Sequence, residues 1–73
     1  ILNILIMAKI QLNGRKLELK TKHSILTLLK KYNIDDKKIA IELNGEIINR
    51  NKYKIVYVKN KDKIEIVHFI GGG

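Results

Sequence analysis

Hydrophobic and polar residues alternate near the start of the chain in a way that predicts a β-hairpin. Residues 8–12 alternate, and residues 15–20 alternate again with Leu17 and Leu19 on one face. Such alternation is typical of a strand that buries one side. Asn13-Gly14 separates the two stretches, and Asn-Gly is the strongest two-residue hairpin signal. The two predicted strands are therefore antiparallel neighbours.

The next stretch has the spacing of a helix. Ser24 is a candidate N-cap, because its hydroxyl can accept a hydrogen bond from a free backbone N–H of the first turn. Asn33 can end the helix, since asparagine tolerates the left-handed conformation. Between them, apolar residues recur at spacings of three and four and form one stripe: Ile25, Leu28, Leu29 and Tyr32.

The second half of the chain predicts more strands. Residues 39–43 are rich in β-branched side chains, and a second Asn-Gly pair leads to a short strand at residues 46–48. A loop or single helical turn at 49–54 precedes an apolar stretch at 55–58, and residues 63–70 alternate as a final strand. Two or three strands therefore follow the helix.

These elements predict an α+β fold in which one main helix crosses one face of a mixed, four- to five-stranded sheet. The last strand finds a natural place beside the first, in parallel, because a parallel pair needs a long crossover and the helix supplies it. That arrangement is the β-grasp, the ubiquitin-like fold. We expect a single domain over residues 1–73.

Composition narrows the function classes. The 73 residues contain no cysteine, which excludes disulfides, thiolate metal sites and thiol catalysis, and is consistent with a reducing cytoplasm. A chain of this size has a thin core, so a large catalytic cleft is not expected. The 15 Lys and Arg residues against 7 Asp and Glu give a formal charge of +8. That charge fits either an AT-rich genome or an acidic partner.

The first six residues are apolar apart from Asn3. This run is far too short to span a bilayer and lacks the basic start of a secretory signal. Because Met7-Ala8-Lys9 resembles an ordinary protein start, we interpret residues 1–6 as an N-terminal extension. The alternative is that they lengthen the first strand.

Few residues suggest catalysis or metal binding. The two histidines, His23 and His68, have no acidic or thiol partner at a recognisable ligand spacing, so we predict no metal site. Glu42, Glu46 and Glu65 alternate with apolar residues, as on solvated strand faces, and no motif pairs them for acid and base catalysis.

The last strand predicts a docking surface. Its period of two places Ile64 and Ile66 on one face, and Glu65, Val67 and Phe69 on the other. If the isoleucines face the helix, Val67 and Phe69 face solvent. Two neighbouring exposed apolar side chains indicate partner docking, although they can also occur by chance.

Three glycines, Gly71, Gly72 and Gly73, follow this strand. An extended glycine arm can enter a narrow cleft, because no Cβ meets the walls. The carboxylate of Gly73 would then be accessible, but it needs activation, most plausibly as an acyl-adenylate made from ATP. The alternative is a frayed end, which is common in proteins.

Three segments together resemble the bacterial sulfur carrier proteins of thiamine biosynthesis, the ThiS family: "IQLNGRKLEL", "LNGEIINRNKY" and "DKIEIVHFIGGG". The resemblance runs from Met7 to Gly73. Its most specific part is Val67, His68 and Phe69 ahead of Gly72-Gly73. Two features depart from the family pattern: Thr27 stands where an acidic residue often follows the helix cap, which would weaken the cap, and the net charge is unusually positive.

The resemblance implies a protein substrate rather than an enzyme. An E1-like adenylyltransferase would adenylate Gly73 with ATP, and a sulfur donor such as a cysteine desulfurase would allow conversion to a thiocarboxylate. Thiazole synthase would receive the sulfur. Gly72 and Gly73 match the family's diglycine, whereas Gly71 matches the longer ending of some members. The carrier itself would bind no cofactor.

Two other functions fit some of the same features. The small-subunit-type sulfur carriers of molybdopterin synthase share the fold and the diglycine, but they usually run longer. A small basic nucleic-acid-binding domain would use the charge of +8. Against it, the four aromatic residues do not cluster in a stacking motif.

Overall fold

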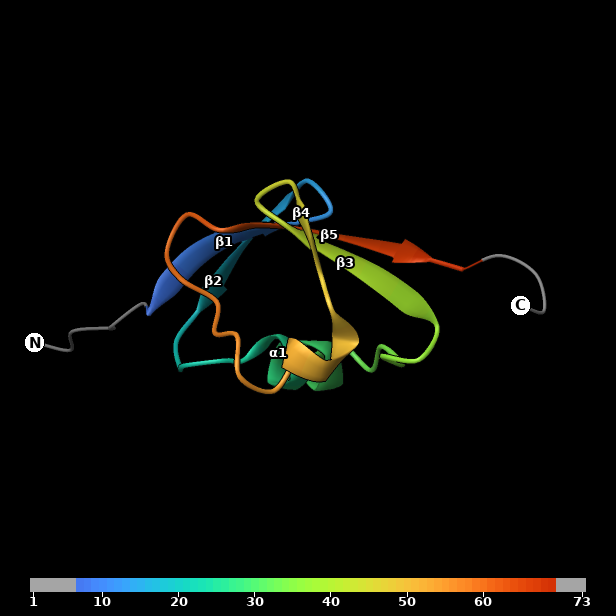
Figure 1. Ribbon diagram of the computed structural model, residues 1–73. Helices are drawn as coiled ribbons and strands as arrows, with labels where there is room; N and C mark the ends of the chain where they lie inside the picture. Colours follow the sequence, from blue (N-terminus) through green and yellow to red (C-terminus); the bar gives the residue numbers. More distant parts are fainter. Residues whose placement is uncertain (1–6, 70–73) are drawn as a thin grey trace, which may run out of the picture.

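The computed structural model describes residues 7–69 (Figure 1). The elements follow the predicted order, with a short 3₁₀ helix, η1, in the position predicted as a loop or helical turn. Their bounds are β1 Ala8–Leu12, β2 Arg15–Leu19, α1 Ile25–Lys31, β3 Ile39–Leu43, β4 Glu46–Ile48, η1 Arg50–Lys52 and β5 Lys63–His68.

Within the described residues, the strands form one five-stranded sheet in the order β2-β1-β5-β3-β4. The central strand, β5, pairs in parallel with β1 and antiparallel with β3. Helix α1 lies across one face of the sheet, and the other face is open (Figure 1). The prediction of a ubiquitin-like β-grasp with a parallel first and last strand is confirmed.

Both Asn-Gly pairs form tight hairpin turns. Asn13 and Gly14 have φ values of 49° and 80°, and Asn44 and Gly45 have 54° and 86°. Positive φ at both central residues is the type I′ geometry, whose twist matches that of the flanking strands. Asn33 also adopts a left-handed φ of 56° just after α1, as predicted for a residue that ends the helix.

The core lies between α1 and the sheet. Ile25, Leu28 and Leu29 of the predicted helical stripe are buried, but Tyr32 is 39% exposed. The prediction for Tyr32 was wrong because the helix ends at Lys31, so Tyr32 is the C-cap and leaves the helical path. Tyr53 is the buried tyrosine instead, and the spacing of apolar residues along the chain does not predict its burial.

The N-terminal cap of α1 has more hydrogen bonds than the sequence predicts. The Ser24 Oγ accepts a hydrogen bond from the Thr27 N–H at 3.1 Å, which is the N-cap contact. The Thr27 hydroxyl in turn donates to the Ser24 carbonyl at 3.0 Å. Thr27 therefore makes its own bond with the cap residue in a first turn that contains no acidic side chain.

The apolar stretch at residues 55–58 does not become a strand of the sheet. Its backbone bonds to the segment that leads into α1: the Ile25 N–H donates to the Val56 carbonyl and the Val58 N–H donates to the His23 carbonyl, both at 2.9 Å. Tyr57 forms only an isolated bridge with Ser24. This connection holds the start of the helix in place.

Two strand ends also differ from the prediction. The second strand ends at Leu19 rather than at residue 20, and β5 ends at His68, while Ile70 lies outside the described residues. In residues 7–69, no helix has the length and apolar character that a membrane crossing would need.

Candidate functional site: the face and end of strand β5

Strand β5 has one buried and one exposed face, as its alternation predicted. Ile64 and Ile66 are buried beneath α1. Val67 and Phe69 point to the open side of the sheet and are 54% and 63% exposed. Large apolar side chains that remain mostly exposed and lie next to one another are candidates for contact with a partner.

The side chains of the two turn asparagines hold β5 from both sides. Asn13 Oδ1 accepts from the Ile66 N–H at 2.6 Å, and Asn13 Nδ2 donates to the Ile66 carbonyl at 3.3 Å. Asn44 Oδ1 accepts from the Lys63 N–H at 2.8 Å, and its Nδ2 donates to Asp62 Oδ1 at 3.0 Å. The sequence predicts both asparagines only as turn residues. The sequence signal for these bonds is the presence of Asn in both turns, because a side-chain amide can donate and accept hydrogen bonds at the same time.

The ordered ladder continues to the last described residue. The Phe69 N–H donates to the Lys38 carbonyl at 2.9 Å, one step beyond the named strand. Gly71, Gly72 and Gly73, which the sequence analysis assigned to the reacting tail, lie outside the described residues, so their roles stay predictions. The described strand fixes the place from which that tail would start.

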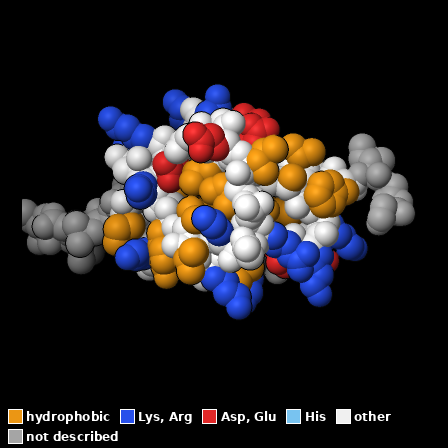
Figure 2. Space-filling view, in the orientation of Figure 1, with side chains coloured by type: hydrophobic (Ala, Val, Ile, Leu, Met, Phe, Trp, Pro, Cys, Tyr) orange, Lys and Arg blue, Asp and Glu red, His pale blue; other side chains and the backbone are white. Residues whose placement is uncertain are grey.

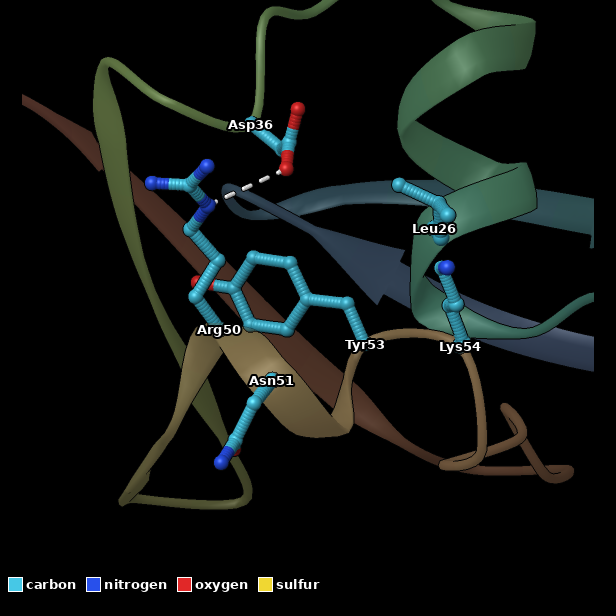
Figure 3. Close-up of a pocket in the computed structure, with 6 residues that line it drawn as sticks. All are labelled: Leu26, Asp36, Arg50, Asn51, Tyr53 and Lys54. Atoms are coloured by element: carbon cyan, nitrogen blue, oxygen red, sulfur yellow. Dashed lines mark ion pairs between the residues drawn. The ribbon is translucent and has the colours of Figure 1, made fainter.

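A shallow pocket beside η1 is a second candidate (Figure 3). Arg50 Nε lies 3.3 Å from Asp36 Oδ2, and the Tyr53 ring lies beside the Arg50 side chain. Burial, followed by the negative charge of Asp36, raises the pKa of Tyr53 above its usual value. A neutral phenol and a carboxylate already paired with arginine do not make an acid and base pair. We therefore assign this pocket a structural role.

The histidines are placed separately. His23 is half-buried, with Nδ1 2.8 Å from the Thr21 carbonyl oxygen, and His68 is exposed at the end of β5. Among residues 7–69, His, Cys, Asp and Glu form no group of three or more that could hold a metal ion.

The fold and the sequence of the chain can be compared with those of known proteins. The model of the ThiS family matches residues 4–73, which is nearly the whole chain. The chain belongs to the ThiS family. The resemblance seen in the sequence is thereby confirmed. A sulfur carrier protein ThiS from Bacillus subtilis is 42% identical over 65 residues, which cover 88% of this chain and 98% of that protein.

Solved and longer ThiS-like proteins agree with this assignment. The crystal structure of a thiamine biosynthesis protein, ThiS, from Geobacter metallireducens superposes with a TM-score of 0.78 at 26% identity, and covers 89% of this chain and 99% of that one. A thiazole synthase from Paramagnetospirillum magneticum is 38% identical over 65 residues, which are 89% of this chain but only 20% of that protein. That synthase therefore contains a segment like this ThiS-family chain together with a much larger remainder.

Proposed function

We propose that this chain is a sulfur carrier in the biosynthesis of the thiazole part of thiamine, and that it acts as a protein substrate rather than as a catalyst. The observation that carries the proposal is strand β5, which is anchored on both sides and exposes Val67, with the exposed Phe69 directly after it. In the sequence, Gly71–Gly73 follow shortly after this strand. The membership in the ThiS family supports it.

The chemistry takes place at Gly73. An E1-like adenylyltransferase joins the Gly73 carboxylate to AMP from ATP and releases pyrophosphate. Sulfur at the oxidation level of sulfide, supplied by a donor such as a cysteine desulfurase with a thiol reductant, then displaces AMP and leaves a thiocarboxylate. Gly71 and Gly72 let the tail extend in the narrow clefts of these enzymes, since they carry no Cβ.

Thiazole synthase is the sulfur acceptor in this proposal. Proteins named thiazole synthase contain a segment similar to this chain, which supports a direct encounter between the two. Val67 and Phe69 supply apolar contact next to the tail and help to seat it. We place the reaction in the cytoplasm, where ATP is available and a chain without cysteine loses no stabilisation.

The test is the intact mass of the chain after incubation with the activating enzyme, ATP and a sulfur donor. We expect a gain equal to the replacement of one oxygen by sulfur. A chain that lacks Gly72 and Gly73 should fold normally but show no gain. The molybdenum-pathway activating enzyme, run beside the thiamine-pathway enzyme, provides a control for specificity. Equal modification by both, or modification of the shortened chain, would contradict the proposal.

A further inference from the structure

Two glutamates face each other on the open side of the sheet. In the antiparallel pairing of β3 with β5, Glu42 stands directly opposite Glu65. Side chains in such positions have Cβ atoms about 5 Å apart, and like charges there destabilise a sheet. The sequence predicts both glutamates as ordinary solvated residues, because their spacing along the chain does not show which strands become neighbours.

The other half of the same face shows the opposite arrangement. Lys9 stands opposite Glu18 in the β1–β2 pair, where unlike charges attract. The chain has 15 Lys and Arg residues against 7 Asp and Glu, so basic side chains are plentiful. Among residues 7–69, Arg50 and Asp36 form an ion pair. In the same residues, no basic nitrogen lies within 4.0 Å of the carboxylate of Glu42 or of Glu65. The repulsion is therefore not relieved by an ion pair with another described residue.

Exposed apolar side chains flank this glutamate pair. Ile47 stands opposite Glu42 across β3 and β4 and is 76% exposed. On the other side, Val67 follows Glu65 by one step along the same face, and Phe69 follows Val67. Figure 2 shows acidic side chains mainly on the upper, sheet side of the molecule, next to exposed hydrophobic ones. Neighbouring exposed apolar side chains mark a candidate protein-binding surface, and charges on such a surface favour a partner of opposite charge.

We propose that Glu42 and Glu65 together receive a basic side chain of thiazole synthase, and that Ile47, Val67 and Phe69 supply the apolar contacts around it. A cation placed between the two carboxylates is attracted by both and offsets the repulsion between them. Binding of the partner therefore removes the unfavourable Glu42–Glu65 interaction that is present in the free chain. An arginine fits best, because its planar guanidinium can donate to two carboxylates at once. This inference rests on the proposed function and adds the chemistry of the partner surface.

The test compares Glu42→Gln and Glu65→Gln with the unchanged chain in binding to thiazole synthase of the same source, at low and high salt. Each variant should bind about tenfold more weakly at low salt, and less salt-dependently, because one charge-assisted contact is lost. Both variants should unfold at the same or higher denaturant concentration than the unchanged chain. Glu18→Gln is the matched control: it removes a negative charge from the same face but should leave binding unchanged.

Two results would overturn the inference. In the first, both glutamine variants bind thiazole synthase at low salt as well as the unchanged chain does, while Phe69→Ala binds more weakly. That result would show that the docking surface is apolar and that the glutamates do not contribute to it. Weaker binding to the activating enzyme, with unchanged binding to thiazole synthase, would show that the glutamates serve the other partner. Failure of the proposed function is distinguishable from both, because it appears as an absent thiocarboxylate in the mass measurement whatever the glutamates do.

Discussion

The side-chain amide of Asn13 exchanges two hydrogen bonds with the backbone of Ile66, a residue 53 positions later in the chain. In the parallel pairing of β1 with β5, Gln11 and Leu12 stand opposite Lys63 and Ile64. The Asn13 backbone N–H still donates to the Ile64 carbonyl at 2.9 Å, and the chain then turns away from β5. The Asn13 side chain supplies the contacts that the next residues of β1 would have made. A single residue therefore shapes the first hairpin and also secures the strand that carries the glycine tail.

Asn13→Gly should separate these two roles. Glycine accepts the positive φ of this turn, so the hairpin survives, whereas both bonds to Ile66 are lost. We expect the free energy of unfolding to fall by about 1–2 kcal/mol, measured by urea denaturation. The amide hydrogen of Ile66 should also exchange faster with solvent.

Asn33→Gly is the control for that measurement. Asn33 also has a positive φ, but its side chain makes no hydrogen bond with the described residues. Its replacement by glycine should change the stability by much less. If the two variants lose equal stability, the side-chain bonds to Ile66 contribute nothing measurable.

A large part of the fold was predictable because its signals are local. The turns at Asn13-Gly14 and Asn44-Gly45, and the Ser24 cap, each follow from a few adjacent residues. The period of two in β5 likewise told which of its side chains would be buried. The prediction that Val67 and Phe69 face solvent was correct for this reason.

What could not be predicted depends on contacts between distant segments. The clamp of Asn13 on Ile66 and the meeting of Glu42 with Glu65 require the order and register of the strands, which no local pattern encodes. Tyr32 and Tyr53 show the same limit, because helical spacing favoured the first for the core while tertiary packing buries the second.

Leu29→Ala tests the core beneath the sheet. Leu29 is almost fully buried in α1, so truncation leaves a cavity and should lower the free energy of unfolding by roughly 2–4 kcal/mol. Tyr32→Ala removes a larger side chain from the same predicted stripe, yet it should cost less, because Tyr32 lies at the exposed end of the helix. Thermal denaturation of both variants measures the difference, and a larger loss for Tyr32→Ala would contradict this placement of the helix.

Tyr53 should make the stability fall at alkaline pH. Burial and Asp36 raise the pKa of Tyr53 above 10.0 in the folded chain. At a pH between the pKa of Tyr53 in the unfolded chain and its pKa in the folded chain, the unfolded chain holds fewer protons. The free energy of unfolding therefore decreases as the pH rises past about 10. Tyr53→Phe removes this contribution. Urea denaturation at pH 8 and pH 11 should therefore show a smaller loss for the variant, and equal losses would exclude Tyr53 as the cause.

Phe69→Ala should separate binding from stability at the end of β5. The Phe69 side chain is mostly exposed, and its backbone bond to Lys38 does not depend on the side chain, so the stability should change by no more than about 0.5 kcal/mol. Truncation of an aromatic anchor at a protein interface commonly costs more than 1 kcal/mol of binding energy, which corresponds to about a fivefold or greater loss of affinity for thiazole synthase. Ile66→Ala is the matched change on the buried face and should instead lower the stability strongly. Unchanged affinity of the folded Phe69→Ala chain for both thiazole synthase and the activating enzyme would remove Phe69 from the docking surface.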